Sequence, residues 1–128
     1  MSTAIIDEVK EKLIDVLDEI CPDNVFLQGT LNSEEDYPQK FVTYIVTATE
    51  LNAFYDNADN ETDFYISVIF YSNNPTEIST YAENIMIALR ANGFILENAG
   101  NDVISDVPTH TGWVMDFIYS KRSNLQWQ

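Results

Sequence analysis

Residues 51–73, LNAFYDNADNETDFYISVIFYSN, join an acidic stretch to the most apolar segment of the chain. In the apolar half, positions 64, 66, 68 and 70 alternate with positions 65, 67, 69 and 71, and both sets contain apolar side chains. This pattern predicts a central strand over Asp63–Ser72, because an inner strand is buried on both faces. The acidic half leaves three alternatives: a metal-binding loop, a surface that imitates DNA, or a polar loop in a protein that works in an assembly. Its acids are Asp56, Asp59, Glu61 and Asp63.

Two amphipathic helices are predicted around this strand region. Apolar residues recur at helical spacing over residues 3–20, until Pro22 stops the pattern. A second helix begins after Asn74 and Pro75, which supply an N-cap and a first-turn proline, and it ends at Asn92–Gly93. Further strands are predicted over Val25–Gly29, Phe41–Ala48, Phe94–Glu97, Val103–Ser105 and Trp113–Ser120.

This order of elements predicts a single α+β domain over residues 1–122 and a short C-terminal tail over residues 123–128. We expect a mostly antiparallel mixed sheet with the two amphipathic helices packed on one face. The predicted core joins Ile6, Val9, Leu13, Leu17, Ile78, Tyr81, Ile85 and Leu89 to Phe64, Ile66, Val68, Phe70, Met115 and Phe117. The opposite face is expected to present Tyr44, Val46, Tyr65, Ile69 and Tyr71. Such a face is typical either of a subunit interface or of ordinary tyrosines in water.

Composition and charge exclude several classes of protein. The chain has 128 residues, 45% of them hydrophobic, which is too apolar for a disordered chain, and it contains no apolar run long enough to span a bilayer. The formal net charge of -15 opposes binding to phosphate backbones and to anionic membranes. The N-terminal residues lack a basic segment followed by an apolar one, so we expect no secretion signal and synthesis in the cytoplasm.

The sequence offers little for catalysis. Cys21 is the single cysteine and His110 the single histidine, and they are far apart in the chain. No GxSxG, HExxH, P-loop or GxGxxG spacing occurs, so acyl transfer, zinc hydrolysis and nucleotide binding lack their usual motifs. We therefore expect a protein that is not an enzyme and needs no cofactor, with His110 in a loop or at the start of a strand.

The acidic stretch does not match a calcium loop. An EF-hand that started at Asp56 would need a ligand at its third position and glycine at its sixth, where this chain has Ala58 and Glu61. We expect no specific metal site there, since Asn and Asp also favour ordinary turns.

Imitation of DNA remains an alternative. Between positions 34 and 63 the chain has eight acids, at 34, 35, 36, 50, 56, 59, 61 and 63, and Lys40 is the single base. A protein that occupies a nucleic-acid-binding cleft presents carboxylates in long rows, whereas these acids cluster in links between predicted strands. The DNA-mimic inhibitor is therefore kept as the second hypothesis.

The order of several segments resembles a known family. The runs FVTYIVTATE, NAFYDNADNETDFYISVIFYSNN, PTEISTYAENIMIALRANGF and HTGWVMDFIYSK resemble the tail terminator or tail-completion proteins from the neck of long-tailed bacteriophages. The resemblance covers roughly residues 1–122 and contains no catalytic signature.

This resemblance implies a structural protein of the virion. Its subunits would form a ring, commonly a hexamer, that caps the tail tube and joins it to the head connector, with the genome passing through. The partners implied are the tail-tube protein and the head-connector protein, without specific nucleic-acid binding and without a membrane. The acids expected to face the lumen or a partner ring are Glu34, Glu35, Asp36, Asp56, Asp59, Glu61 and Asp63. The expected subunit contacts are Tyr44, Tyr65, Tyr71 and Trp127.

Overall fold

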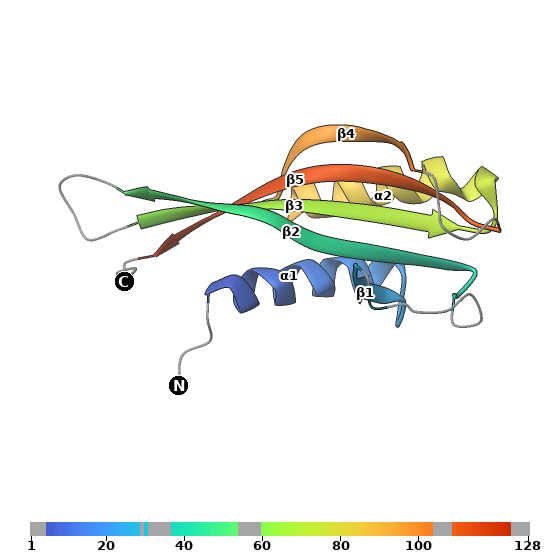
Figure 1. The fold of residues 1–128 in the computed structure, drawn as a ribbon, viewed down its shortest axis with the longest axis horizontal. Helices are drawn as coiled ribbons and strands as arrows, with labels where there is room; N and C mark the ends of the chain where they lie inside the picture. The colour runs from blue at the N-terminus through green and yellow to red at the C-terminus, as the bar shows by residue number, and fades with distance from the viewer. Residues whose placement is uncertain (1–4, 29, 31–36, 54–59, 104–108, 124–128) are drawn as a thin grey trace.

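A computed structural model describes residues 5–28, 30, 37–53, 60–103 and 109–123. The elements are α1 (Ile5–Ile20), β1 (Val25–Leu27), β2 (Lys40–Ala53), β3 (Asn60–Ser72), a 3-10 turn (Pro75–Glu77), α2 (Ile78–Ala91), β4 (Ile95–Val103) and β5 (Thr111–Ser123). The strands form one five-stranded sheet in the order β1-β2-β3-β5-β4 (Figure 1). Among the described strands, β1 pairs in parallel with β2, and the other pairs are antiparallel. The predicted α+β class and mostly antiparallel mixed sheet are confirmed.

The central position of β3 is confirmed by its two long pairings. It pairs with β2 on one side and with β5 on the other. Val68 lies opposite Tyr44 in β2 and opposite Met115 in β5, and all three side chains point to the side of the sheet that the helices cover. We call this the helix side, and the opposite side the outer face.

Helix α1 covers the sheet with a stripe of apolar residues. Val9, Leu13 and Leu17 are buried, as predicted. Ile6 was expected in the core but is 38% exposed, and Ile5 is buried in its place. The two residues are adjacent, so a shift of one position at the helix start changes which of them faces inward.

Helix α2 ends where the sequence predicts, but it begins at Ile78, after a 3-10 turn over Pro75–Glu77 where the sequence predicts its first turn. Asn74 caps the turn that leads into it, because its side-chain oxygen accepts a hydrogen bond from the Thr76 backbone N–H at 3.1 Å. At the far end Gly93 has a φ of 90°, a conformation that glycine adopts without a Cβ clash. The Phe94 N–H then donates to the Leu89 carbonyl at 3.0 Å, which closes the helix.

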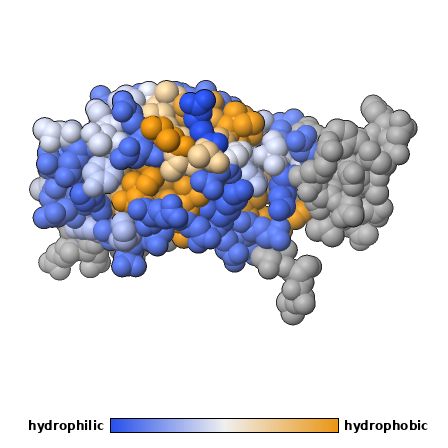
Figure 2. Space-filling view, turned by 180° about the vertical axis from the view of Figure 1, so that it is seen from behind, coloured by the Kyte–Doolittle hydropathy of each residue, from blue (hydrophilic) through white to orange (hydrophobic). Residues whose placement is uncertain are grey.

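One hydrophobic core lies between the helices and the sheet. It contains almost all residues predicted for it, together with Cys21, Val42, Tyr44, Ala82 and Phe94. Tyr81 packs against the core but is only partly buried. The view from behind shows a mostly hydrophilic surface with a hydrophobic patch near its centre (Figure 2). The large hydrophobic side chains that the described part exposes are Ile6, Leu27, Leu51, Ile87 and Ile95.

Several strand predictions were wrong in extent. β2 runs to Ala53 and β3 starts at Asn60, so Glu61 belongs to a strand and not to a loop. Cross-strand pairing overrides the low strand propensity of the acids and amides in these segments. The two short strands expected over 94–97 and 103–105 are one strand, β4, whose register against β5 shifts twice. Such shifts are typical of β-bulges, which bend a strand without ending it.

Candidate functional site

The outer face of the sheet is the candidate site. No described helix covers it, because α1 and α2 both pack into the core on the helix side. Tyr65 and Tyr71 of β3 lie on this face, as predicted. Tyr44 and Val46 do not: they pair with Val68 and Ile66, and Tyr44 is only 8% exposed within the helix-side core. The prediction failed because both sets of alternate residues in β2 are apolar, so the sequence does not reveal which set faces the helices.

Carboxylates surround Tyr65 near the middle of the outer face. Its hydroxyl donates to Glu50 Oε2 at 3.2 Å. This hydrogen bond raises the pKa of the Tyr65 hydroxyl above its ordinary value, and the negative charges of Glu50, Asp63 and Glu97 raise it further. Tyr65 therefore sits in a negative field, because each of these acids disfavours a second negative charge beside it.

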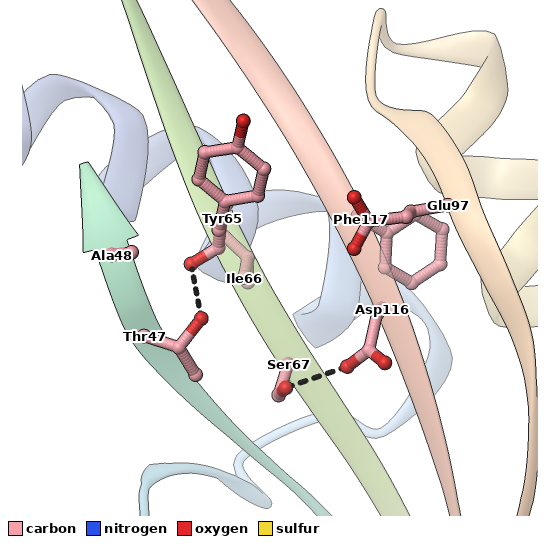
Figure 3. A pocket seen from close by; sticks show the side chains of 8 residues that line it. All are labelled: Thr47, Ala48, Tyr65, Ile66, Ser67, Glu97, Asp116 and Phe117. Carbon is pink, nitrogen blue, oxygen red and sulfur yellow. Dashed lines mark hydrogen bonds between the residues drawn. The ribbon is translucent and has the colours of Figure 1, made fainter. Parts of the chain in front are cut away.

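A shallow hollow lies beside Tyr65, between β2, β4 and β5 (Figure 3). It has a volume of about 410 Å³. Ser67 and Asp116 form part of its lining, and the Ser67 hydroxyl donates to Asp116 Oδ1 at 2.6 Å. The complete lining is Thr47, Ala48, Tyr65, Ile66, Ser67, Glu97, Asp116 and Phe117. The hollow is thus open, aromatic on one side and acidic on the other.

Apolar residues flank this hollow. Ile95 is 58% exposed and pairs with Ile118, which is partly buried. Val114 continues the same row on β5 and pairs with Ile69 of β3. The outer face therefore combines aliphatic side chains with carboxylates, whereas the helix side is almost wholly apolar.

Basic side chains gather on the helix side. Lys40 lies 3.6 Å from Glu77 and donates to the Tyr81 hydroxyl at 2.9 Å. Lys121 lies 3.7 Å from Glu8 of α1, and Lys12 donates to the Tyr119 hydroxyl at 3.3 Å. The other bases with described side chains, Lys10 and Arg90, belong to the two helices. Among the described side chains, no lysine or arginine forms an ion pair with Glu50, Glu97 or Asp116.

The opposite end of the outer face is filled by aromatic rings. Phe41 stacks on Tyr71 with ring centroids 4.9 Å apart, and Tyr37 and His110 pack against Phe41. His110 Nε2 lies 2.8 Å from the Pro38 carbonyl oxygen. A carbonyl oxygen only accepts, so Nε2 donates to it, and in the neutral ring Nδ1 then accepts from the Thr109 hydroxyl at 2.9 Å. These contacts give His110 a packing role at this end of the sheet.

Cys21 and His110 lie on opposite sides of the sheet. Cys21 belongs to the helix-side core, as a buried residue at the end of α1, and desolvation raises the pKa of its thiol to about 11. A thiol that stays protonated is a poor nucleophile.

The described residues contain no group of three or more His, Cys, Asp or Glu side chains arranged to hold a metal ion. Asp56 and Asp59 lie outside the described residues, so the structure leaves the predicted lack of a metal loop untested.

Two of the seven predicted lumen acids are described. Glu61 and Asp63 lie on β3, close to the hairpin end of the sheet, where the strands extend past the start of α1 (Figure 1). Asp63 accepts a hydrogen bond from the Ser120 hydroxyl at 2.6 Å. The predicted residues outside the described part are Glu34, Glu35, Asp36, Asp56, Asp59 and Trp127.

Sequence reasoning missed the other acids of the outer face. Asp116 interrupts the apolar strand WVMDFIY, which is a signal that a polar neighbour or a partner faces it. Glu97 gave no such signal, because it was assigned to a short strand beside a turn. Only the register of β4 places Asn98 opposite Asp116 and brings Glu97 to the hollow.

Comparison with known proteins assigns no family to the chain. No protein-family model matches it, and no curated protein matches it. Within the described part, neither helix has the length and apolar character needed to cross a membrane.

Proposed function

We propose that the chain is a structural subunit from the neck of a long-tailed bacteriophage, a tail terminator or tail-completion protein. In this proposal its subunits form a ring, commonly of six, that caps the tail tube and joins it to the head connector. The subunit catalyses no reaction and binds no cofactor. Its acids repel the phosphates of the passing genome, so that DNA does not adhere to the channel.

The observation that carries the proposal is the contrast between a well-packed helix side and an open outer face, where no described lysine or arginine contacts Glu97 or Asp116. A protein that works through contacts needs a rigid domain and a free surface, and the outer face supplies that surface. The order of segments that resembles the tail terminator family supports the same conclusion. The acids proposed to face the lumen or a partner ring are Glu34, Glu35, Asp36, Asp56, Asp59, Glu61 and Asp63. Tyr65, Tyr71 and Trp127 remain proposed contacts with other subunits or components.

Assembly in the presence of tube protein tests this proposal. The purified chain, mixed with the tail-tube protein of the same phage, is expected to form a ring at the end of each tube and to stop its growth, seen by light scattering and electron microscopy. A phage that lacks the gene is expected to make overlong tails or tails without heads. Normal virions made without this protein would end the proposal.

Charge reversal tests the role of the acids within the ring. Glu61→Lys is expected to leave folding and assembly intact and to slow DNA ejection, because a basic channel attracts each passing phosphate. Glu11→Lys, with the same charge change on the exposed side of α1, is the matched control and is expected to leave ejection unchanged. Equal ejection rates for both variants and the wild type would exclude Glu61 from the lumen.

An acidic DNA-mimic inhibitor is the second candidate, and one observation favours it. Helix α1 presents a row of exposed acids along its length. The row consists of Asp7, Glu8, Glu11, Asp15, Asp18 and Glu19. A mimic would bind a nucleic-acid-binding protein in competition with DNA, and neutralising this row would abolish the competition. Under this hypothesis, deletion of the gene leaves tail length unchanged, which separates it from the neck hypothesis.

A further inference from the structure

We propose that the outer face binds a protein partner that combines arginine or lysine side chains with apolar ones. The binding surface is the hollow beside Tyr65 and the aliphatic row next to it. The inference deepens the proposed function and rests on it for one point, that the partner is a neighbouring component of the neck and not a second copy of this chain.

The mixture of residues on this face defines the chemistry of the partner. A partner that packs on this face removes apolar side chains from water, which favours binding. These side chains are Ile95, Ile118 and Val114. The same contact buries Glu97 and Asp116. A carboxylate moved out of water without a cation or a hydrogen-bond donor opposes binding strongly. A partner that buries this face therefore brings positive charge together with apolar surface.

Tyr65 supplies a second reason for a cation. Its ring forms one wall of the hollow, with Asp116 and Glu97 on the other side (Figure 3). A guanidinium group stacks on an aromatic ring and donates to carboxylates in the plane of its nitrogens. The hollow thus offers an arginine side chain both kinds of contact at once.

A second copy of this chain does not fit the requirement. The chain has six lysines and arginines against 21 acids. Lys12, Lys40 and Lys121 already contact tyrosine hydroxyls or carboxylates on the helix side. Two outer faces brought together would also place like charges opposite each other, which disfavours pairing. A different, basic protein satisfies the charges that a copy leaves unpaired.

Peptide binding tests the inference on the isolated chain. The probe is a capped seven-residue peptide of alternating arginine and isoleucine, titrated into the labelled protein at physiological salt and followed by NMR. The two control peptides replace every arginine with glutamine, or every isoleucine with glycine. We expect the first peptide to shift the backbone signals of residues 65–69, 95–98 and 114–118. We expect each control to bind at least about tenfold more weakly.

Matched protein variants separate the outer face from general attraction to an acidic protein. The double variant Glu97→Gln, Asp116→Asn is expected to weaken binding of the arginine–isoleucine peptide by about tenfold or more. The double variant Glu11→Gln, Asp15→Asn removes the same charge from exposed positions on α1 and is expected to change binding less than about twofold. If Asp116→Asn disturbs the fold, the exposed Glu97→Gln alone carries the test.

Four results would overturn the inference. They are equal weakening by both double variants, equal binding of the glutamine peptide, signal shifts confined to other residues, and outer-face shifts that appear on concentration of the protein alone. The last would mean that a second copy occupies the face. The test is independent of the neck role: peptide binding as expected, together with normal virions from a phage that lacks the gene, would refute the neck role and leave the inference standing.

Discussion

The helix side and the outer face of the sheet are formed by the same strands, yet they differ in burial and in charge. On the helix side Phe64, Val68 and Phe117 are at most 1% exposed, and lysines at the margin tie the helices to the sheet. On the outer face Ile95 is exposed, Tyr65 is only partly buried, and Glu97 and Asp116 line an open hollow. The comparison teaches that the helices bury one face of this sheet, whereas the middle of the other face keeps an open hollow that no described helix covers.

The largest effect is expected from a charge placed on the helix side. Ile85→Asp puts a carboxylate where the native side chain is fully buried and should cost more than about 4 kcal/mol, enough to unfold the domain. Ile87→Asp, two positions along α2 where the native side chain is 67% exposed, is the matched control and should change stability by less than about 0.5 kcal/mol. Thermal unfolding followed by circular dichroism measures both. A folded Ile85→Asp variant with an unchanged melting temperature would show that the helix side is not the core.

A smaller effect is expected at Gly100, in the second register shift of β4, between Asn98 and Asn101. Gly100 has a φ of 111°, and a Cβ there would collide with the Val114 carbonyl oxygen and the Trp113 indole. Gly100→Ala should therefore cost about 2–4 kcal/mol, measured by denaturant unfolding. Gly93→Ala has a similar φ without the collision, since its nearest neighbour is Tyr119 at 3.6 Å, and should cost about 1–2 kcal/mol. Equal losses would mean that backbone strain alone, and not the close approach to Trp113, requires glycine in β4.

The free energy of unfolding should depend on pH through the buried thiol of Cys21. The pKa of Cys21 is raised from about 9 to about 11, so the folded state binds its proton more tightly than the unfolded chain does. This contribution, on the order of a few kcal/mol, is complete below pH 9 and is lost as the pH rises to about 11. The stability difference between the wild type and Cys21→Ala should shrink over that range, measured by urea unfolding. A constant difference would mean that the thiol is accessible to water.

The smallest effect is expected at a buried hydroxyl of the outer face. Thr43 Oγ1 is buried, and no described residue forms a hydrogen bond with it. Thr43→Val removes the unpaired group at nearly the same shape and should stabilise the protein by up to about 1 kcal/mol. Thr49→Val, at an exposed position of the same strand, should leave stability unchanged. A loss of stability in Thr43→Val would show that the hydroxyl has a partner, such as bound water.

The sequence predicted the framework of the fold because its strongest signals are local. The stripe of α2 ends at Asn92–Gly93, and the alternation in β3 and β5 identifies their inner faces. Prediction from the sequence failed where the same pattern of residues is compatible with two different structures. In β2 both alternate sets are apolar, so Tyr44 was assigned to the wrong face, and in β4 a bulge looked like a turn.

The candidate site was less predictable than the fold because it is assembled from distant segments. Tyr65 was recognised as a surface residue of β3, but Glu50, Glu97 and Asp116 come from three other strands. Their proximity depends on the pairing of β3 with β5 and on the register shift in β4. Local patterns do not carry pairing information between segments so far apart.

The strand order also governs when the chain can fold during synthesis. β5 follows all the other described elements in the chain, yet it lies between β3 and β4. Until it emerges from the ribosome, β4 has no strand beside it, β3 keeps one open edge, and Met115 and Phe117 are missing from the core. Native folding therefore requires β5, and a chain synthesised only as far as β4 exposes the open edge of the apolar strand β3.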